Sequence, residues 1–310
     1  MNQVTRNAPG DAPEGLSPAT VEEIAVFVEP ARKIGIHDLK PATFLPLSRT
    51  AIFIAGSSVP GGSTEHIIKV FTEPRQAGRE LLAISILGEG AEGCFILRGT
   101  ALYPEVAGVE RLDPKRTLLM GLVMPYYPYS LDMFIDRFTP LETSVREEVA
   151  LLMILRLSRA VRYAHRKGLL HCDIKPENIL ANDYEERLAD WDRCRLLTDV
   201  TVREDLFRGF GSPRYHVVLE SDWSVVMIDR VGLVMVFLEL LGLLEPVDVL
   251  VPTMQLKTVT EAAAKTENEF LRDAMRRFCR VKRNRPPPPE QVRIDASAGK
   301  DSGGERGALH

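Results

Sequence analysis

Cysteine is scarce in this sequence, and the few cysteines present follow no regular spacing. The 310 residues include four cysteines, no two of which form a Cys-x-x-Cys pair (Cys94, Cys172, Cys194 and Cys279). A zinc site or a disulfide framework requires cysteines at short or recurrent spacings. The sequence therefore predicts neither, and we expect an intracellular, most simply cytoplasmic, protein whose thiols stay reduced.

The sequence also lacks a membrane-length apolar run and a strong net charge. Its most apolar stretch, VGLVMVFLELLGLL at 231–244, is shorter than the roughly 20 residues of a membrane-spanning helix and contains Glu239. Residues 1–15 lack the basic and then apolar order of a signal peptide. A net charge of −4 gives no reason to expect nucleic acid or an anionic membrane as a partner. We therefore expect a buried helix at 231–244 and no nucleic-acid or membrane partner.

Two kinds of segment lie between tails of biased composition. Residues 1–20 and 286–310 are rich in proline, glycine and polar residues, and we expect both to be disordered. Short β-branched and apolar runs, TAIFIAGS and EHIIKVF, are joined by a Pro-Gly-Gly loop and predict a hairpin. From about residue 130 onward, apolar residues recur at three- and four-residue steps, which predicts helices. The sequence thus predicts an α+β protein with a small β-rich part before a larger helical part.

The densest group of reactive side chains is HCDIKPENIL at 171–180. It resembles the catalytic loop of eukaryotic protein kinases, whose pattern is H-R-D-x-K-P-x-N. The alternative interpretation is an ordinary polar loop in which Asp173 or Asn178 caps a helix. We expect His171 to be structural, packed under Trp191 and bonded to the backbone, rather than a general base.

Other segments resemble the remaining motifs of that family, in the family's order. LADWD at 188–192 resembles L-A-D-F-G, and IIKVF at 67–71 resembles the strand V-A-I-K. GSPRYHVVLE at 211–220 resembles the end of the activation segment. The resemblance also assigns the lysine of the strand, the glutamate that pairs with it, the aspartate of a buried helix, and a late glutamate–arginine pair (Lys69, Glu80, Asp229, and Glu220 with Arg285).

The resemblance implies a role for each residue in phosphoryl transfer from ATP. This reaction requires neutralised charge and fixed geometry more than covalent help. Asp190 and Asn178 are expected to bind Mg²⁺, and Asp173 is expected to orient the substrate hydroxyl. Lys175 is expected to place positive charge beside the γ-phosphate. Lys69 is expected to hold the α- and β-phosphates.

The adenine base is expected at the join between the two parts of the chain. The resemblance makes Met124 the gatekeeper, the Pro125 carbonyl an acceptor and the Tyr127 N–H a donor. Proline has no N–H, but the family uses only the carbonyl at that position. The nucleotide-binding residues that the resemblance implies are Lys69, Glu80, Ile54, Ile67, Met124, Pro125, Tyr127 and Asp190.

Four departures from the family pattern bear on activity. The place of the glycine-rich loop falls on FLPLSRT at 44–50, which contains no glycine. Losing two charge-assisted N–H contacts to phosphate costs about 3–6 kcal/mol, which lowers activity without necessarily abolishing it. Ile67 replaces the small alanine of the adenine pocket, Asp192 replaces the glycine of D-F-G, and Cys172 replaces the arginine that pairs with a phosphorylated activation loop.

These motifs predict a bilobal protein kinase fold, with a small β-rich N-lobe and a larger, mainly helical C-lobe. The expected boundaries are a disordered tail, an N-terminal extension, the N-lobe, the C-lobe and a second tail (1–20, 21–39, 40–125, 126–285 and 286–310). The expected activity is transfer of the γ-phosphoryl group of ATP to Ser or Thr hydroxyls of a protein substrate, with ATP and Mg²⁺ required. Lys175 and Ser212 are typical of Ser/Thr-directed members.

Two other functions fit part of the sequence. A pseudokinase, acting as a nucleotide-binding or interaction scaffold, is favoured by the missing glycines, by Ile67 and by Asp192. A small-molecule phosphotransferase of related fold is a third interpretation. Such enzymes lack the Lys-Pro pair and have no segment like GSPRYHVVLE.

The loss of the arginine at Cys172 leads to a testable expectation. With no cation there to receive a phosphate, activity should not depend on phosphorylation of the activation loop. Replacing Thr198 and Thr201 together with alanine should leave the rate of phosphoryl transfer unchanged, as measured with radiolabelled ATP. Loss of activity in a variant that still folds would show that the loop is regulated in another way.

Overall fold

The computed structural model describes most of the central part of the chain. The described residues are 19, 21–42, 51–58, 65–71, 73–105, 120–138, 140–199, 212–220, 223–245 and 254–280. The predicted disordered tails, the segment 44–50, Thr201 and Arg285 lie outside these residues, apart from residue 19 of the first tail.

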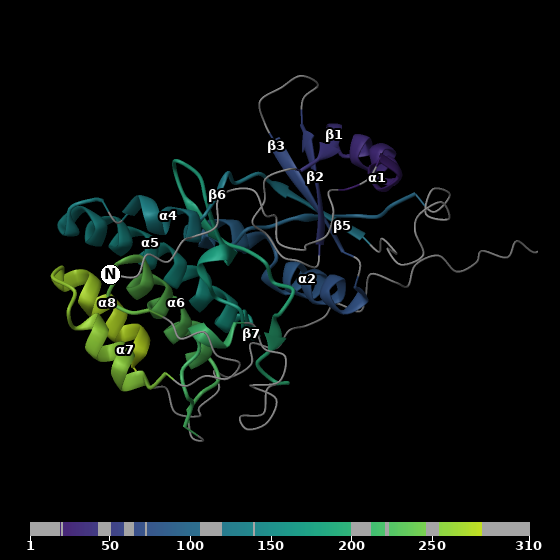
Figure 1. Ribbon diagram of the computed structural model, residues 1–310. Helices are drawn as coiled ribbons and strands as arrows, with labels where there is room; N and C mark the ends of the chain where they lie inside the picture. The colour runs from purple at the N-terminus through teal and green to yellow at the C-terminus, as the bar shows by residue number, and fades with distance from the viewer. Residues whose placement is uncertain are drawn as a thin grey trace, which may run out of the picture.

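The first part of the chain forms one antiparallel sheet of five strands. The strands lie in the order β1-β2-β3-β5-β4, with bounds His37–Pro41, Ala51–Ser57, Glu65–Phe71, Met120–Pro125 and Thr100–Leu102. The hairpin expected from the two β-rich runs is the pair β2–β3. Helix α1 (Val21–Lys33) packs on one face of the sheet and α2 (Pro74–Leu87) on the other (Figure 1). The boundary expected between the N-terminal extension and the N-lobe, at residue 40, falls inside β1.

Alternation along β3 determines which side chains face each helix, because successive strand residues point to opposite faces. Ile68 and Val70 belong to the apolar cluster that includes Phe27 of α1. Ile67 and Phe71 belong to the cluster that includes Ala77 of α2. Lys69 lies between Ile67 and Phe71, so its side chain is directed to the α2 side.

The contact between α1 and the sheet depends on a glycine. A Cβ atom at Gly121 would lie 2.7 Å from Cγ2 of Ile68 and 3.2 Å from Cε1 of Phe27. The bare backbone of β5 at this point therefore lets the Phe27 ring approach closely, and Phe27 has no solvent exposure. The N-terminal extension is thus part of the same core as the sheet.

The second part of the chain is mainly helical. Its helices are α4, α5, α6, α7 and α8, with bounds Leu131–Phe138, Thr143–Arg166, Met227–Leu240, Leu256–Ala263 and Glu269–Cys279. Short strands form a sheet in the order β6-β8-β9 (Tyr129–Ser130, Ile179–Ala181 and Glu186–Leu188) and the pair β7–β10 (Leu169–Leu170 and Arg195–Leu196). The 3₁₀ turns are η1, η2 and η3 (Glu89–Cys94, Pro176–Asn178 and Pro213–Tyr215). The predicted α+β class and its order are confirmed.

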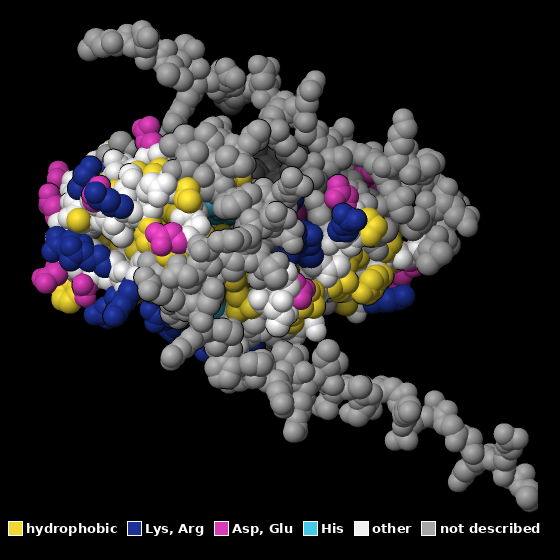
Figure 2. Space-filling model, turned by 90° about the horizontal axis from the view of Figure 1, so that it is seen from below, with side chains coloured by type: hydrophobic (Ala, Val, Ile, Leu, Met, Phe, Trp, Pro, Cys, Tyr) yellow, Lys and Arg dark blue, Asp and Glu magenta, His cyan; other side chains and the backbone are white. Residues whose placement is uncertain are grey.

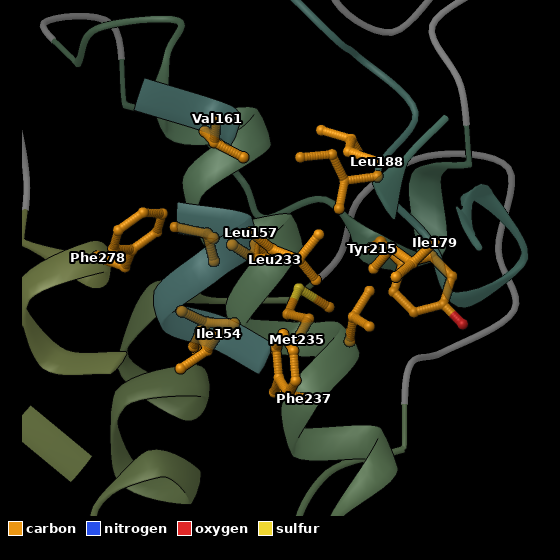
Figure 3. Packing of buried hydrophobic residues seen from close by; sticks show 14 of the residues in the cluster. Ile154, Leu157, Val161, Ile179, Leu188, Tyr215, Leu233, Met235, Phe237 and Phe278 are labelled. Atoms are coloured by element: carbon orange, nitrogen blue, oxygen red, sulfur yellow. The ribbon is translucent and has the colours of Figure 1, made fainter. Parts of the chain in front are cut away.

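Helix α6 forms the centre of the helical part, because it is apolar on nearly every side. Leu233 and Phe237 of α6 are fully buried and pack with Leu157 of α5 and Phe278 of α8 in one cluster (Figure 3). A helix that is apolar all round has to be enclosed by other elements. The buried helix predicted for 231–244 is confirmed over the residues that α6 covers.

The two parts are connected by hydrogen bonds as well as by the chain at β5. The N–H of Leu97 donates to the carbonyl of Leu188 at 2.8 Å, and the N–H of Leu188 donates to the carbonyl of Phe95 at 3.0 Å. The Tyr163 hydroxyl of α5 donates to the carbonyl of Leu87, at the end of α2, at 2.6 Å. These bonds fix α2 and the start of β4 against the helical part.

The surface carries charges of both signs. Dark-blue and magenta side chains lie beside one another at the end of the molecule that the C-terminal helices form (Figure 2). Examples are Lys257 with Glu261 at 3.7 Å and Arg277 with Asp273 at 3.0 Å. Exposed pairs of this kind stabilise a helix by about 0.3–0.5 kcal/mol each. Among the described residues, no helix combines the length and the apolar character needed to cross a membrane.

The packing of α1 generates a stability prediction. Replacing Phe27 with alanine should lower the free energy of unfolding by about 3–5 kcal/mol, because it removes a fully buried ring and leaves a cavity against Gly121. Denaturant unfolding measures this difference. The neighbouring Val28, which is 48% exposed, is the control, and Val28→Ala should change stability by less than about 0.5 kcal/mol. Equal effects of the two variants would mean that α1 is not part of the cooperative core.

Candidate active site

Lys69 joins the sheet to the helical part of the molecule. Its ammonium group forms an ion pair and a hydrogen bond with Asp190, which follows β9, and lies 3.6 Å from Oε2 of Glu80 in α2. All three residues were predicted to act together, and the structure brings them together. The Trp191 N–H also donates a hydrogen bond to Glu80, so α2 is held against the segment that carries Asp190.

In this group two carboxyl groups share one ammonium group, and the pKa values of all three are shifted. Burial alone would raise the pKa of Asp190, but the nearby ammonium groups of Lys69 and Lys175 hold it below its usual range. Burial raises the pKa of Glu80 to about 7, since Lys69 offsets only part of the cost of a second buried carboxylate. Burial would lower the pKa of Lys69, but Asp190 and Glu80 raise it instead. Lys69 is therefore a permanent cation whose main partner is Asp190.

The catalytic-loop residues lie together at η2. Nδ2 of Asn178 donates to the backbone carbonyl of Asp173 at 2.8 Å and to its Oδ2 atom at 3.2 Å. The Lys175 ammonium lies 3.4 Å from the same Oδ2 atom. The other oxygen, Oδ1, is buried and has no hydrogen-bond partner among the described residues. One carboxylate oxygen of Asp173 is thus held by neighbours, and the other is available to a ligand.

A buried carboxylate in α6 supports this loop. Oδ2 of Asp229 accepts from the His171 N–H, and Oδ1 accepts from the Cys172 N–H, both at 2.8 Å. Oδ2 also lies 2.8 Å from Nε2 of His165 at the end of α5. Burial would raise the pKa of Asp229, but the bonds from His165 and His171 hold it below its usual range. The steadying position that the resemblance implied for Asp229 agrees with these bonds.

Asp229 compensates for strained backbone. Cys172 has φ of 67° and Asp190 has φ of 64°, in the left-handed region that costs non-glycine residues about 1–3 kcal/mol. The two backbone hydrogen bonds that Asp229 accepts hold the loop at Cys172. Such strain is common at functional sites. Here it lies at Asp190 itself and at Cys172, the residue before Asp173.

His171 has the structural position that the sequence predicted. Its Nε2 atom donates to the carbonyl of Ala189 at 2.9 Å, and its Nδ1 atom accepts from the Asp173 N–H at 3.3 Å. Its ring centroid lies 4.5 Å from that of Trp191. Both ring nitrogens are engaged in this way, so neither has a free position for general-base chemistry.

Asp192, which replaces a glycine of the family pattern, is buried beside the other carboxylates. Burial, and then the charge of Asp190, raise its pKa to about 6. Nε of Arg193 lies 3.8 Å from its Oδ1 atom, and Arg79 of α2 donates to its backbone carbonyl at 3.5 Å. Near pH 7, Asp192 is therefore a charged group in a site that already holds more carboxylates than cations.

The predicted hinge follows β5. Met124 lies opposite Ile67 in the β3–β5 register, and both belong to the cluster on the cleft side of the sheet. Pro125 ends the strand and is exposed. The Tyr127 hydroxyl donates to Oε1 of Glu185 at 2.6 Å, and Glu185 pairs with Arg187 at 2.7 Å. The hinge is thereby fixed to the turn between β8 and β9.

One predicted nucleotide-binding residue, Ile54, is wrongly placed by the sequence interpretation. It lies opposite Ile68 in the β2–β3 register, and both pack with Phe27 on the face that α1 covers. Since side chains alternate along a strand, Ala55, opposite Ile67, faces the cleft instead. The reason for the error is that the register of β2 is set by its partner strand, which the apolar run TAIFIAGS does not reveal.

Sequence reasoning also missed several residues that the fold brings to the site. Leu180 and Ala189 pack with Tyr127 in a small apolar cluster under the hinge. Leu180 follows the catalytic loop and Ala189 precedes Asp190, so their nearness to the motifs was an available signal. For His165 the only signal was its place just before the catalytic loop, and for Glu185 there was none.

The residues present fit a magnesium nucleotide. Because Nδ2 of Asn178 is engaged by Asp173, its carbonyl oxygen is the atom left for a cation. This oxygen and the Asp190 carboxylate are hard donors of the kind that Mg²⁺ prefers, and phosphate oxygens and water usually complete its shell. Among the described residues, no group of three or more His, Cys, Asp or Glu side chains is arranged as a complete metal site. The donor set therefore fits an ion brought with phosphate rather than an ion held by protein alone.

Comparison with known proteins agrees with this geometry. A family model described as "Protein kinase domain" matches residues 112–217. The serine/threonine-protein kinase PknK of Mycobacterium tuberculosis is 42% identical over 77 residues, covering 24% of this chain and 7% of that protein. A probable serine/threonine-protein kinase of Schizosaccharomyces pombe is 41% identical over 69 residues, covering 20% and 9%. A probable serine/threonine-protein kinase, gdt4, of Dictyostelium discoideum is 25% identical over 130 residues, covering 39% and 8%.

The matched segments of this chain are thus similar to the eukaryotic protein kinase superfamily, through relatives that are named as serine/threonine kinases. The bilobal kinase fold expected from the sequence is confirmed, with the sheet and α2 as the N-lobe and the helical part as the C-lobe. The similar segments span between 7% and 9% of the length of the three relatives named above.

The raised pKa of Asp192 generates a pH prediction. A carboxyl group whose pKa rises on folding stabilises the folded state while protonated, and this stability is lost as the pH rises. From about pH 4, the unfolded value, to about pH 6, the free energy of unfolding of the wild type should therefore fall relative to that of Asp192→Asn, by about 1–3 kcal/mol. Urea unfolding at pH 4.5 and 7.5 measures the difference. Asp183→Asn, at an exposed carboxylate, is the control and should follow the wild type; the same behaviour from Asp192→Asn would mean that Asp192 is well solvated.

Proposed function

We propose that this chain is an ATP- and Mg²⁺-dependent protein kinase that phosphorylates serine and threonine hydroxyls of protein substrates. The proposal depends on one observation: Lys69 from the N-lobe meets Asp190 from the C-lobe, beside the loop that carries Asp173. The Ala189 N–H donates to the backbone carbonyl of Asn178 at 2.9 Å, which ties the segment of Asp190 directly to that loop.

Each residue has a definite task in this proposal. Asp173 accepts a hydrogen bond from the substrate hydroxyl through Oδ1, the oxygen that its neighbours leave unengaged, and so orients the attacking oxygen. Lys175, 3.4 Å from Oδ2, places positive charge where the transferred phosphoryl group passes. Asn178 and Asp190 are the residues that would hold Mg²⁺, which neutralises charge on the phosphate oxygens when it is bound.

The adenine and ribose side of the nucleotide belongs under the N-lobe sheet. Ala55, Ile67 and Met124 supply the upper wall, and Leu180 and Ala189 supply the floor near Tyr127. Lys69 turns from Asp190 to the α- and β-phosphates when nucleotide enters. Because Glu80 has no other charged partner among the described residues than Lys69, it keeps that ammonium in the cleft.

The proposal extends to the surroundings of the site. We infer an N-lobe of residues 40–125 and a C-lobe of residues 126–285, with an extension at 21–39, in an intracellular and most simply cytoplasmic protein. Its partners are ATP and a protein substrate, with no role for nucleic acid or membrane. Preference for serine or threonine is supported by Lys175 and by Ser212, which begins the turn η3.

A second function, a nucleotide-binding or interaction scaffold, is favoured by two observations. Ile67 is 5% exposed and packs against Met124, so the adenine wall is bulkier than the alanine of the family pattern leaves it. Asp192 adds a buried carboxylate beside Asp190. Both features reduce the room and the favourable charge for a nucleotide, and neither removes a residue with a task in the transfer.

Replacing Asp173 with asparagine tests the proposal directly. The variant keeps an acceptor oxygen for Asn178 but loses the carboxylate that orients the hydroxyl, so the rate of phosphoryl transfer should fall by about 10²- to 10⁴-fold. The assay measures transfer of the γ-phosphoryl group of radiolabelled ATP to the protein itself and to a generic basic protein. Signals of equal size from wild type and variant would identify the scaffold instead.

Nucleotide binding is measured separately, by the shift in melting temperature that ATP causes with and without Mg²⁺. Asp173→Asn should retain the Mg²⁺-dependent shift, whereas Asp190→Asn should lose most of it. This pair separates a binding defect from a catalytic defect. No shift in the wild type at any ATP concentration would contradict both functions that involve nucleotide.

A further inference from the structure

A second cavity lies on the other side of the hinge from the proposed nucleotide site. It has a volume of about 370 Å³ and is lined by four parts of the fold, namely the α1–β1 connection, the start of β3, residues 96–100 before and at β4, and the hinge. Arg187 of β9 closes one side. Lys69, Asp190, Leu180 and Ala189 do not line it.

Strand alternation explains how this cavity reaches the α1 side of the sheet, although Met124, Pro125 and Tyr127 of the hinge also line it. His66 and Val123 line it, and they occupy strand positions adjacent to Ile67 and Met124, whose side chains face the cleft. Ile36, from the connection after α1, lines the cavity and packs in the same apolar cluster as Val123. The cavity therefore opens on the α1 side of the sheet and contacts the hinge from behind.

The lining combines aliphatic side chains with polar and basic groups. Ile34, Ile36, Ile96 and Leu97 supply aliphatic surface, and Ile34 borders the opening, since it is 45% exposed. Such a surface suits the hydrocarbon or aromatic body of a ligand, because its burial removes apolar area from water.

The charged groups of the lining differ in whether they are already paired. Arg187 forms a two-pronged pair with Glu185, with distances of 3.0 and 2.7 Å, and also donates to the Glu92 carbonyl. The Glu92 carboxylate lies on an exposed residue, in contact with water. Arg98 is only partly exposed and has no carboxylate partner among the described residues. Its guanidinium is thus the cation of the lining that remains for a ligand.

A second polar group in the lining also lacks a partner. Nδ1 of the His66 ring is buried and makes no hydrogen bond within the described part of the chain. A buried polar atom without a partner costs free energy that a ligand can recover. Arg98 offers donors to an acceptor with several lone pairs, and His66 offers a further donor in the tautomer that carries its proton on Nδ1.

We propose that this cavity is a binding site for a small amphipathic carboxylate, an aliphatic or aromatic body that ends in one anionic group. The body lies against Ile34, Ile36 and Leu97, and the carboxylate accepts hydrogen bonds from Arg98 and His66. A neutral ligand of the same shape could accept a hydrogen bond but would lack the charge that strengthens it, so the negative charge is the main determinant of specificity. The site adjoins the hinge and shares Met124, Pro125 and Tyr127 with the proposed nucleotide site, but it contains none of the residues proposed to act in phosphoryl transfer.

The test uses 4-phenylbutyrate as the probe and 4-phenylbutan-1-ol, of the same length and body, as its uncharged counterpart. Saturation-transfer NMR with the full chain, without nucleotide, gives each dissociation constant. The carboxylate should bind with a dissociation constant on the order of 1 mM, as expected for a ligand of this size. The alcohol should bind at least about tenfold more weakly, since it lacks a charge-assisted bond to Arg98.

Three variants locate the site. Arg98→Gln should weaken carboxylate binding about tenfold or more, and Ile34→Trp should abolish it by filling the opening. Arg276→Gln, which removes an exposed arginine of α8, is the matched control and should bind as the wild type does. Circular dichroism and thermal melting check that each variant is folded.

Any of three results would overturn the proposal: no binding of 4-phenylbutyrate by folded wild type up to 10-fold above the expected constant, equal binding of acid and alcohol, or unchanged binding in both Arg98→Gln and Ile34→Trp. Because no nucleotide is present, failure here leaves the proposed kinase activity untouched. Failure of the kinase assay likewise leaves this binding measurement unaffected.

Discussion

The ion pair between Lys69 and Asp190 is the interaction on which the arrangement of the site depends. It spans the two lobes. Burial disfavours the charged form of Asp190, and Lys69, the one buried cation of the described cleft, offsets this cost. Glu80 approaches the same ammonium from α2, so the position of that helix is part of the same electrostatic balance. Charge brought into the interior of a protein has to be paired, and here the pairing also defines the opening between the lobes.

A second carboxylate, Asp229, does comparable work below the cleft by hydrogen bonding rather than by ion pairing. It accepts N–H groups of His171 and Cys172 and contacts His165, and the strained backbone at Cys172 is held in this way. α6 is buried on nearly every side, which makes it a rigid base for that carboxylate. The positions of Asp173 and Asn178 therefore depend on a helix that contributes no group to the proposed chemistry.

The local sequence was enough to predict which residues of one motif lie together. Asp173, Lys175 and Asn178 are close in the chain, and a short turn brings them together. It also predicted the packed, backbone-bonded His171 and the buried α6. It failed at Ile54, because which face of β2 meets the cleft depends on register with β3, a long-range pairing. It could not predict the bond from Tyr127 to Glu185, since those residues lie 58 positions apart and belong to no common motif.

The sequence by itself determined the class of fold, the resemblance to protein kinases and the chemical types of the residues in the candidate site. These follow from hydrophobic periodicity and from motifs with fixed spacing, both of which can be recognised in the sequence without knowledge of tertiary contacts. Only the tertiary structure decided how α1 covers the sheet through Gly121 and Phe27 and how Asp192 is buried among carboxylates. It also decided that a cavity arises behind the hinge, with Arg98 in its lining and no carboxylate partner for Arg98 in the described part of the chain. Each of these results from packing between segments distant in the chain, where burial and pairing depend on neighbours that local sequence does not specify.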